Sequence, residues 1–379
     1  MVETIDWESK QSYLLLNPRL SEEDRTKLSC VLNYSNDFPA HIWVAGSESS
    51  GDIKLVGLSK TAILAAAKAT NDHLASNQTD VWYNALPSFH VGGLGIMARG
   101  FLSGAKVKQT HSKWSPETFI DEVNYLGATL TSLVPTQVYD LVLGGHQAPP
   151  SLRGVIVSGG SLPLSHHQDA RNLGWPLMQS YGLTECASQV ATGRHDHPSL
   201  KLLNHIESKL DPLGCLMLRS PSLFSAYATP ISDGMTFRDP KVEGWLTTDD
   251  IVELTVEGYM KMLGRKGDFV KIGGESVSMP RLEQILETVR RRRQYAGDIA
   301  LIAVPDERLS HVIQLAVERK HKGDLKTLVV DFNTHVLPFE RIRKVHELDY
   351  LPRSPLRKLL RGELLKLIAE RLKQDGMAA

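Results

Sequence analysis

The stretch Ser180-Tyr181-Gly182-Leu183-Thr184-Glu185 decides how this chain is interpreted. It combines an aromatic ring, a conformationally free glycine, a hydroxyl and a carboxylate in one short segment. Four other distinctive segments surround it, and their fixed order along the chain makes chance a poor explanation. These segments are Ser47 to Lys54 on the upstream side and, downstream, Gly244 to Asp250, Gly264-Arg265 and Pro352 to Lys358.

Composition limits the class of protein. A chain of 379 residues can form two or three domains with a sizeable core. Its 43 basic and 43 acidic residues cancel, so no overall charge attracts nucleic acid or anionic lipid, and a small-molecule partner is the better expectation. Cys30, Cys186 and Cys215 are scattered, which disfavours a zinc site or a disulfide framework. With no signal-peptide pattern and no membrane-length apolar run, we expect a cytoplasmic protein.

Apolar runs alternate with helical patterns in the first part of the chain. Residues 40–45 predict a strand that leads into the polar loop beginning at Ser47, and residues 61–67 predict the helix beyond that loop. Strand, loop and helix in this order are the context that an anion-binding loop requires. Residues 129–134 and 154–157 predict further strands of a largely buried sheet.

The pattern changes after Leu216, where short alternating strands and turns favour antiparallel structure. A last unit contains a predicted helix at 280–290, a strand at 299–304 and a closing helix around 359–372. We therefore predict a mixed α/β protein with a large domain over residues 1–266 and a small α+β domain over residues 267–379.

The loop from Ser47 to Lys54 has a composition suited to phosphate. Backbone N–H groups, hydroxyls and one cation can together wrap a polyphosphate. Serine-rich loops are common, so an ordinary connecting loop is the alternative for this segment alone. The candidate phosphate-binding residues are Ser47, Ser49, Ser50, Gly51 and Lys54.

Together the five segments resemble the motifs of the adenylate-forming superfamily, which includes acyl-CoA synthetases, adenylation domains and luciferases. The resemblance extends from about residue 43 to the C-terminus. It implies a large domain of sheets flanked by helices, a small mobile C-terminal domain, and the use of ATP, Mg²⁺ and coenzyme A. Because relatives commonly have many more residues before the phosphate loop than the 46 found here, we expect a large domain shortened at its N-terminus.

The resemblance also assigns roles around the adenine and the α-phosphate. It implies that Tyr181 stacks near the adenine beside Gly182, that Thr184 contacts the α-phosphate, and that Glu185 holds magnesium. A hard dication prefers such a carboxylate and keeps several waters when it bridges to phosphate. Gly159-Gly160 resembles the adenine-side loop of the family. The alternative for the Tyr181 to Glu185 motif is a turn with a surface glutamate.

Further roles follow for the second half of the chain. The resemblance implies that Asp250 accepts hydrogen bonds from both ribose hydroxyls and that Arg265 supports the ribose and a phosphate. Gly267 takes the hinge position, and Gly273-Gly274 belongs to the loop that enters the site for thioester formation. Lys358 matches the lysine that bridges the attacking carboxylate and the α-phosphate. The alternatives are that Asp250 is an aspartate at a strand end, that Arg265 is a surface arginine, and that Lys358 lies on the solvated face of a helix start.

The acid substrate is suggested by Leu86 to Leu94 and the following Met97-Ala98-Arg99-Gly100, which resemble a segment of acyl-CoA synthetases. The continuation through Gly104-Ala105-Lys106-Val107 looks most like o-succinylbenzoate–CoA ligases of menaquinone biosynthesis. Such a ligase activates one carboxylate of a dicarboxylate and must neutralise the other. Arg99 and His90 are the candidates for the second contact. The alternative makes His90 a pocket-wall histidine and Arg99 a cation on a helix surface.

Several departures from the family pattern keep other functions open. Glu48 and Ile53 alter the phosphate loop, Asp249 precedes the ribose-binding aspartate in place of glycine, and Arg357 stands beside Lys358. The alternatives are a ligase for another aryl or acyl acid, including one that loads a carrier protein, and a degenerate nucleotide-binding or regulatory protein without turnover. The arginine run 290–293 ends a helix, so we interpret it as structural and not as an RNA site. A homo-oligomer remains possible.

Overall fold

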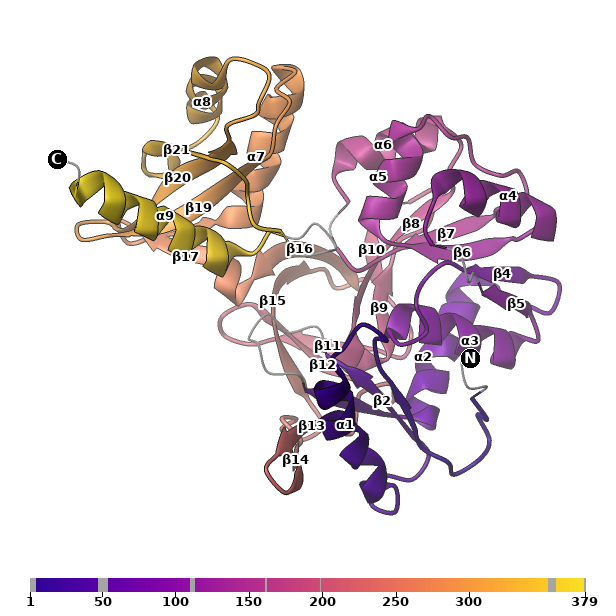
Figure 1. Cartoon of the computed structure of the whole chain (residues 1–379). Coiled ribbons are helices and arrows are strands. Elements are labelled where there is room, and N and C mark those ends of the chain that lie inside the picture. The colour runs from indigo at the N-terminus through magenta and orange to yellow at the C-terminus, as the bar shows by residue number, and fades with distance from the viewer. Residues whose placement is uncertain are drawn as a thin grey trace. The chain divides into compact units, whose positions relative to one another are not determined.

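The computed structural model describes residues 5–46, 54–109, 113–160, 162–197, 199–353 and 359–377, without the side chains of 276, 369 and 372–377 (Figure 1). The chain packs into two compact units. Unit 1 comprises residues 1–248 and 253–261, and unit 2 comprises residues 249–252 and 262–379. The functional domain boundary after residue 266 and the hinge at Gly267 stay predictions.

The centre of unit 1 is a run of parallel strands that becomes antiparallel at one end, in the order β10-β9-β8-β7-β6-β4-β5. Neighbours from β5 to β8 pair in parallel, whereas β9 pairs antiparallel with both β8 and β10. The strands are β4 Val81–Asn84, β5 Lys106–Gln109, β6 Leu130–Leu133, β7 Gly154–Val157, β8 Leu177–Leu183, β9 Ser188–Thr192 and β10 Leu200–Leu202.

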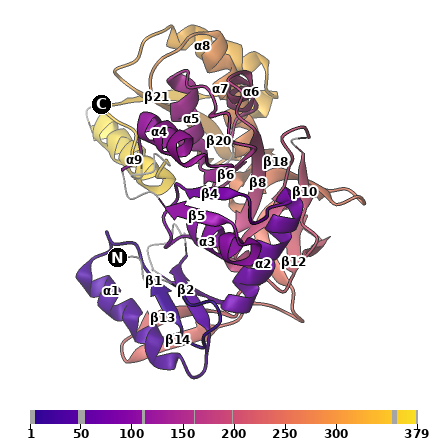
Figure 2. The same cartoon turned by 90° about the vertical axis from the view of Figure 1, so that its right-hand side faces the viewer.

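Helices cover both faces of this sheet, because successive strand residues point to opposite sides. Tyr83 and Val155 pack into the apolar layer beneath α4, α5 and α6, whereas Trp82 and Ile156 pack with α2 and α3. Both Figure 1 and Figure 2 show α4 and α5 on one side of β4 and β6, with α2 and α3 on the other. The helices are α2 Lys60–Leu74, α3 Val91–Ser103, α4 Pro116–Leu126, α5 Pro135–Leu143 and α6 Leu164–Asn172.

A second sheet of unit 1 combines two distant parts of the chain, in the order β1-β2-β3-β13-β14 (Figure 2). One face packs against α1 Glu22–Ser29 and the 3₁₀ helix η1 Cys30–Tyr34, and the other packs against α2 and α3. Its strands are β1 Tyr13–Leu15, β2 His41–Ala45, β3 Leu55–Ser59, β13 Ala226–Ile231 and β14 Gly234–Arg238. Unit 1 also contains the antiparallel hairpin of β11 Glu207–Leu210 and β12 Cys215–Arg219.

Strands β15 Leu246–Leu254 and β16 Tyr259–Arg265 contribute residues to both units. Unit 2 has the hairpin β17 Phe269–Ile272 and β18 Glu275–Ser278, after the 3₁₀ turn η3 Lys266–Asp268. Its main sheet β19-β20-β21 packs α7 and α8 on one face and α9 on the other. The remaining elements are α7 Met279–Arg292, β19 Ile299–Asp306, β20 Ser310–Glu318, α8 Leu325–Thr334, η4 Pro338–Glu340, β21 Lys344–Leu348 and α9 Arg361–Met377.

The mixed α/β class and the main elements expected from the sequence are confirmed. The runs at 129–134, 154–157 and 299–304 form β6, β7 and β19, and the expected helices form α2, α7 and α9. One expectation is wrong in detail: the loop after β2 leads into strand β3 before helix α2 begins at Lys60. No helix in the described part of the chain has the length and apolarity needed to cross a membrane.

The arginine run at the end of α7 is satisfied within unit 2. Arg290 and Arg291 pair with Glu287, which lies one turn earlier on the helix. Arg292 and Arg293 both pair with Asp331 on α8, and these contacts lower the pKa of Asp331. The run therefore ties two helices together, as expected for a structural role.

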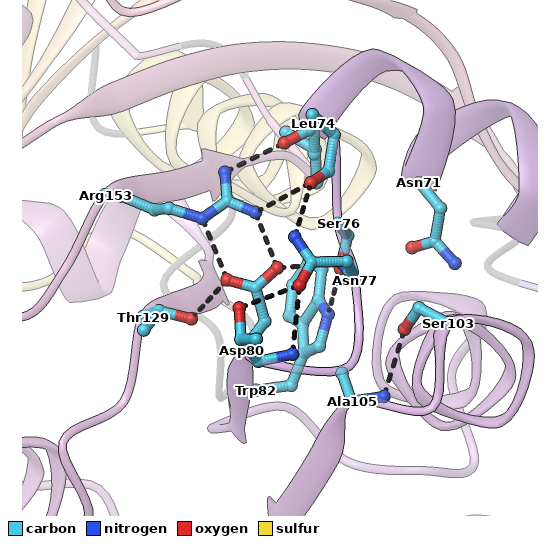
Figure 3. Close-up of polar contacts among 12 residues, drawn as sticks. Asn71, Leu74, Ser76, Asn77, Asp80, Trp82, Ser103, Ala105, Thr129 and Arg153 are labelled. Carbon is cyan, nitrogen blue, oxygen red and sulfur yellow. Dashed lines mark hydrogen bonds and ion pairs between the residues drawn. The ribbon is translucent and has the colours of Figure 1, made fainter.

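A polar cluster joins the amino ends of three neighbouring strands in unit 1 (Figure 3). Asp80, Thr129 and Arg153 stand directly before β4, β6 and β7. Arg153 donates from Nε and Nη2 to the two carboxylate oxygens of Asp80 at 2.8 and 2.7 Å, and Thr129 Oγ1 donates to the same carboxylate at 2.7 Å. Burial favours the neutral acid, but hydrogen bonds from Arg153, the Asn77 amide and Thr129 outweigh it and lower the pKa of Asp80 to about 2.

Candidate active site

Predicted site residues of unit 1 gather at the opposite, carboxyl edge of the parallel strands. The Leu86 to His90 segment follows β4, Gly159-Gly160 follows β7, and Tyr181 to Glu185 close β8. Because β4, β6, β7 and β8 run in the same direction, these segments all leave the sheet at one edge. Ligands of open α/β sheets bind at this edge, so the fold places the predicted residues where a ligand site is expected.

The turn after β8 depends on Gly182. The pairing of β8 with β9 shifts register between Tyr181 and Gly182, and the chain then makes the 3₁₀ turn η2 Thr184–Cys186. A side-chain carbon added at Gly182 would collide with the backbone carbonyl of Ser188 on the returning strand. Only glycine permits this close approach, which presents Thr184 and Glu185 directly after the strand end.

A segment from Ser222 to Tyr227 holds this turn at three points. The Phe224 amide donates to the Glu185 carbonyl at 2.8 Å, and the Tyr227 hydroxyl donates to Oε1 of Glu185 at 2.8 Å. Cys186 Sγ lies 3.2 Å from Ser222 Oγ, and burial raises the pKa of the Cys186 thiol to about 12, so the thiol stays neutral. Tyr227 lies outside the five motif segments, and Glu185 is distant from it along the chain, so no local pattern indicates this contact.

Lys54, at the end of the predicted phosphate loop, also contacts Tyr227. The Gly46 amide donates to the Lys54 carbonyl at 2.9 Å and closes the loop between β2 and β3. Lys54 Nζ lies 3.9 Å from the ring centroid of Tyr227. Lys54 and Glu185 therefore both contact Tyr227, one through its ring and one through its hydroxyl. The other predicted phosphate contacts lie outside the described residues: Ser47, Ser49, Ser50 and Gly51.

Arg99 is a buried cation in helix α3 and not the helix-surface residue of the alternative view. Arg99 is only 2% exposed. Burial lowers the pKa of its guanidinium to about 9, so the group stays charged at neutral pH. Nε and Nη1 have no hydrogen-bond partner among the described residues. The guanidinium carbon lies 5.3 Å from the Trp82 ring centroid, and Nη2 approaches Gly95. A buried cation of this kind is costly without an anion, so the site suits a carboxylate.

His90 is placed differently from Arg99. His90 is the N-cap residue of α3 and is exposed. The centroid of its ring lies 4.7 Å from the ring centroid of Phe89. Although the residue is exposed, partial desolvation of the ring lowers its pKa, which keeps the imidazole neutral near pH 7. A neutral ring can donate a hydrogen bond but cannot neutralise a carboxylate, so Arg99 is the better candidate for that contact.

Unit 2 brings together the predicted ribose pair. Arg265 Nε donates to Oδ1 of Asp250 at 3.0 Å, with Asp250 3% exposed and the arginine largely exposed. In the hairpin β17–β18, Gly273 and Gly274 have φ values of 58° and 90°, the left-handed pair that a two-residue turn needs. The hairpin tip is exposed. Lys358 lies outside the described residues, so its role stays a prediction.

A separate cavity of about 420 Å³ lies away from these residues. It is at the far end of β9, where Thr192 and the Arg194 to His197 turn meet the C-terminal half of α2. None of the predicted site residues lines it. This cavity is therefore not the candidate site, which is defined by the carboxyl ends of the strands and the motif turns that follow them.

The fold and site agree with the class of protein that the motifs suggested. Residues 47–218 match the family model described as AMP-binding enzyme. The solved o-succinylbenzoate coenzyme A synthetase from Bacillus subtilis in complex with AMP is similar with a TM-score of 0.75 and 25% identity, covering 85% of this chain and 68% of that one. The same enzyme in complex with ATP and magnesium gives a TM-score of 0.74 at 25% identity, covering 85% and 69%. The resemblance to the adenylate-forming enzymes is therefore confirmed.

Sequence relatives point to one branch of that class. The 2-succinylbenzoate–CoA ligase of Bacillus pumilus (strain SAFR-032) is 27% identical over 307 residues, which are 77% of this chain and 62% of that protein. The ligase of the same name from Bacillus cytotoxicus is 26% identical over 324 residues, 81% of this chain and 66% of that protein. The chain thus spans just under two thirds of the length of these curated relatives. The expected likeness to o-succinylbenzoate–CoA ligases is confirmed.

Proposed function

We propose that this chain is an AMP-forming acid–CoA ligase and that its acid is o-succinylbenzoate. The match to AMP-binding enzymes and the ligase names of its relatives support the reaction class. The gathering of the motif residues at the carboxyl edge of β4 to β8 supports a catalytic site there. The proposed compartment is the cytoplasm, an assignment supported by three free cysteines.

ATP and magnesium would be held by residues of the described motifs. Tyr181 and Gly159-Gly160 are assigned to the adenine, Asp250 to the ribose hydroxyls, and Lys54 to the phosphates. Glu185 fits a magnesium ion, because a half-buried carboxylate fixed by a neutral phenol can offer its other oxygen to a hard cation. Magnesium would neutralise phosphate charge there.

The proposed reaction has two steps. In the first, a carboxylate oxygen of the acid attacks the α-phosphorus of ATP, the bond from that phosphorus to the bridging oxygen breaks, and pyrophosphate leaves. Thr184 and Lys358 would stabilise the charge that develops on the α-phosphate. In the second step the CoA thiol loses its proton to solvent and its sulfur attacks the acyl carbon. The bond from that carbon to the oxygen on phosphorus breaks, and AMP leaves with this oxygen. The Gly273-Gly274 turn and a rotation at Gly267 belong to this second step.

The observation that carries the choice of acid is the burial of Arg99 without a described hydrogen-bond partner on Nε or Nη1. A monocarboxylate would lose its charge to the adenylate and leave this cation unpaired. A dicarboxylate retains a second carboxylate that can accept two hydrogen bonds from the guanidinium fork. This requirement is met by o-succinylbenzoate, the acid named for the relatives.

Pyrophosphate release over a panel of acids tests the proposal. We expect ATP-dependent release with o-succinylbenzoate, followed by consumption of CoA thiol. Release only with another aryl or acyl acid would keep the reaction class and reject the substrate. Binding of ATP without release for any acid, free or with a carrier protein as acceptor, would favour a nucleotide-binding protein without turnover.

A further inference from the structure

We propose that Tyr227 is a positioning residue that sets both the Glu185 carboxylate and the Lys54 ammonium for Mg·ATP. This inference rests on the proposed function, because it assigns an aim to groups already placed near the phosphates. It adds a residue outside the five motif segments and gives it two separate tasks, one carried by its hydroxyl and one by its ring.

The contacts of Tyr227 separate the two tasks. Its hydroxyl donates to Oε1 of Glu185 at 2.8 Å, which fixes the carboxylate while the second oxygen can face a cation. Its ring lies 3.9 Å from Lys54 Nζ, within the range in which an aromatic face attracts an ammonium. Tyr227 is half-buried, so neither contact is a freely solvated surface pair.

The backbone around Tyr227 explains why this residue can reach both groups. Strand β13 pairs antiparallel with β3, and Tyr227 lies opposite Val56, two residues after Lys54. Just before β13, the Phe224 amide binds the Glu185 carbonyl and the Ser225 amide binds the Gly57 carbonyl. The segment therefore connects the turn after β8 in one sheet to the strand that ends the phosphate loop in the other sheet.

The chemistry gives a reason for a tyrosine at this position. Lys54 and Glu185 carry opposite charges, and groups that share a neighbour can form a direct ion pair and so satisfy each other. Tyr227 contacts the ammonium with its ring and the carboxylate with its hydroxyl, and it adds no charge of its own to either group. In the proposed site the ammonium is directed at phosphate oxygens and the carboxylate at magnesium.

Binding measurements on the full chain separate the two tasks. ATP binding is followed by titration calorimetry over a series of Mg²⁺ concentrations, so the readout does not depend on turnover. Tyr227→Phe keeps the ring and removes the hydroxyl, and it should raise the Mg²⁺ concentration for half-maximal ATP binding about tenfold, as for other lost partners of a metal ligand. Tyr227→Leu removes the ring as well and should also weaken ATP binding at saturating Mg²⁺ by about threefold.

Two controls test whether the effect passes through Glu185. Tyr125→Phe makes the same chemical change at a tyrosine that is 90% exposed, and it should leave the Mg²⁺ dependence unchanged. Tyr227→Phe added to Glu185→Gln should cause no further shift, because the carboxylate that it positions is already gone. Thermal melting of Tyr227→Phe close to that of the unaltered chain verifies folding.

Each outcome decides the matter. An unchanged Mg²⁺ dependence in Tyr227→Phe, an equal shift in Tyr125→Phe, or full additivity with Glu185→Gln would overturn the positioning role. Mg·ATP binding by the unaltered chain without pyrophosphate release would reject the proposed function and still leave the role of Tyr227 measured. Absence of Mg·ATP binding in the unaltered chain would overturn both.

Discussion

Two arginines with partners on or directly before β4 have opposite surroundings. Arg153 is 40% exposed at its side chain, yet it binds both oxygens of the buried Asp80 and donates from Nη1 to the Leu74 carbonyl at 2.8 Å (Figure 3). Arg99 is 2% exposed and faces the ring of Trp82, two residues after Asp80, with Nε and Nη1 unpaired among the described residues. The more exposed cation is the better paired one.

Under the proposed function, the difference separates a charge that stabilises the fold from a charge that would bind the substrate. Asp80 and Arg153 pair with each other and connect the amino ends of β4 and β7, so the pair stabilises the folded state. Burying Arg99 without a described counter-ion costs stability that only a bound anion would recover. We therefore expect substitutions in the first group to lower stability and those in the second to lower activity.

The largest expected effect tests this division at Lys358, a predicted functional charge. Lys358→Ala should slow acyl-AMP formation about a hundredfold or more, because removing one preorganised charge contact costs about 3 kcal/mol at the transition state. Thioester formation from supplied acyl-AMP should remain nearly normal, and the melting temperature should not change. Pyrophosphate release and single-turnover thioester assays measure the two half-reactions.

Arg357→Ala is the matched control for Lys358→Ala, since it removes the neighbouring cation. It should be much milder. A larger adenylation defect from Arg357→Ala, or equal damage to both half-reactions by Lys358→Ala, would remove Lys358 from the catalytic role.

The stabilising side of the comparison is tested by Arg153→Met. This change leaves the Asp80 carboxylate buried without its cation, and we expect it to lower the free energy of unfolding by about 2 to 3 kcal/mol. The value lies below that of a fully buried pair because Arg153 is 40% exposed. Urea unfolding measures it, and stability equal to the unaltered chain would show that the pair does not hold the strand ends.

The same substitution at the other arginine should behave in the opposite way. Arg99→Met replaces a buried cation that has no counter-ion among the described residues by an apolar side chain of similar length, so stability should be unchanged or higher. The KM for o-succinylbenzoate should rise about tenfold or more, which is the loss of one charged hydrogen-bonded contact. The KM for a monocarboxylate analogue should change little. Equal losses on both acids, or a large drop in stability, would make Arg99 a structural residue.

Sequence patterns predicted the local parts of this site better than the distant ones. Gly182 and the turn to Glu185 were predictable because the carbonyl that restricts Gly182 belongs to Ser188, which is close along the chain. Tyr227 was missed because it stands 42 residues from Glu185 and reaches it only through the pairing of β13 with β3. Arg99 was a candidate by position, but its burial depends on the packing of α3 against β4 and α2, which no single segment encodes. Strand β3 was overlooked for a local reason, because its apolar residues stand directly before the strong helix pattern of α2.

The smallest expected effect is a pH dependence of stability that belongs to Asp80. Its pKa is about 2 in the folded chain against an ordinary value of 3.8, so the unfolded state binds more protons in that interval and stability falls as the pH is lowered. This contribution is complete above pH 4 to 5 and is lost as the pH passes down towards 2. Between pH 5 and pH 3 it amounts to about 1 kcal/mol, since one pKa unit corresponds to about 1.4 kcal/mol. Other carboxylates also titrate in this range, so the informative quantity is the difference between the unaltered chain and Arg153→Met in urea unfolding at the two pH values. Arg153→Met should lose less stability on acidification, because Asp80 without its cation is protonated more easily. Parallel losses in the two proteins would show that Arg153 does not set the charge of Asp80, and the contrast between the two arginines would then rest on burial alone.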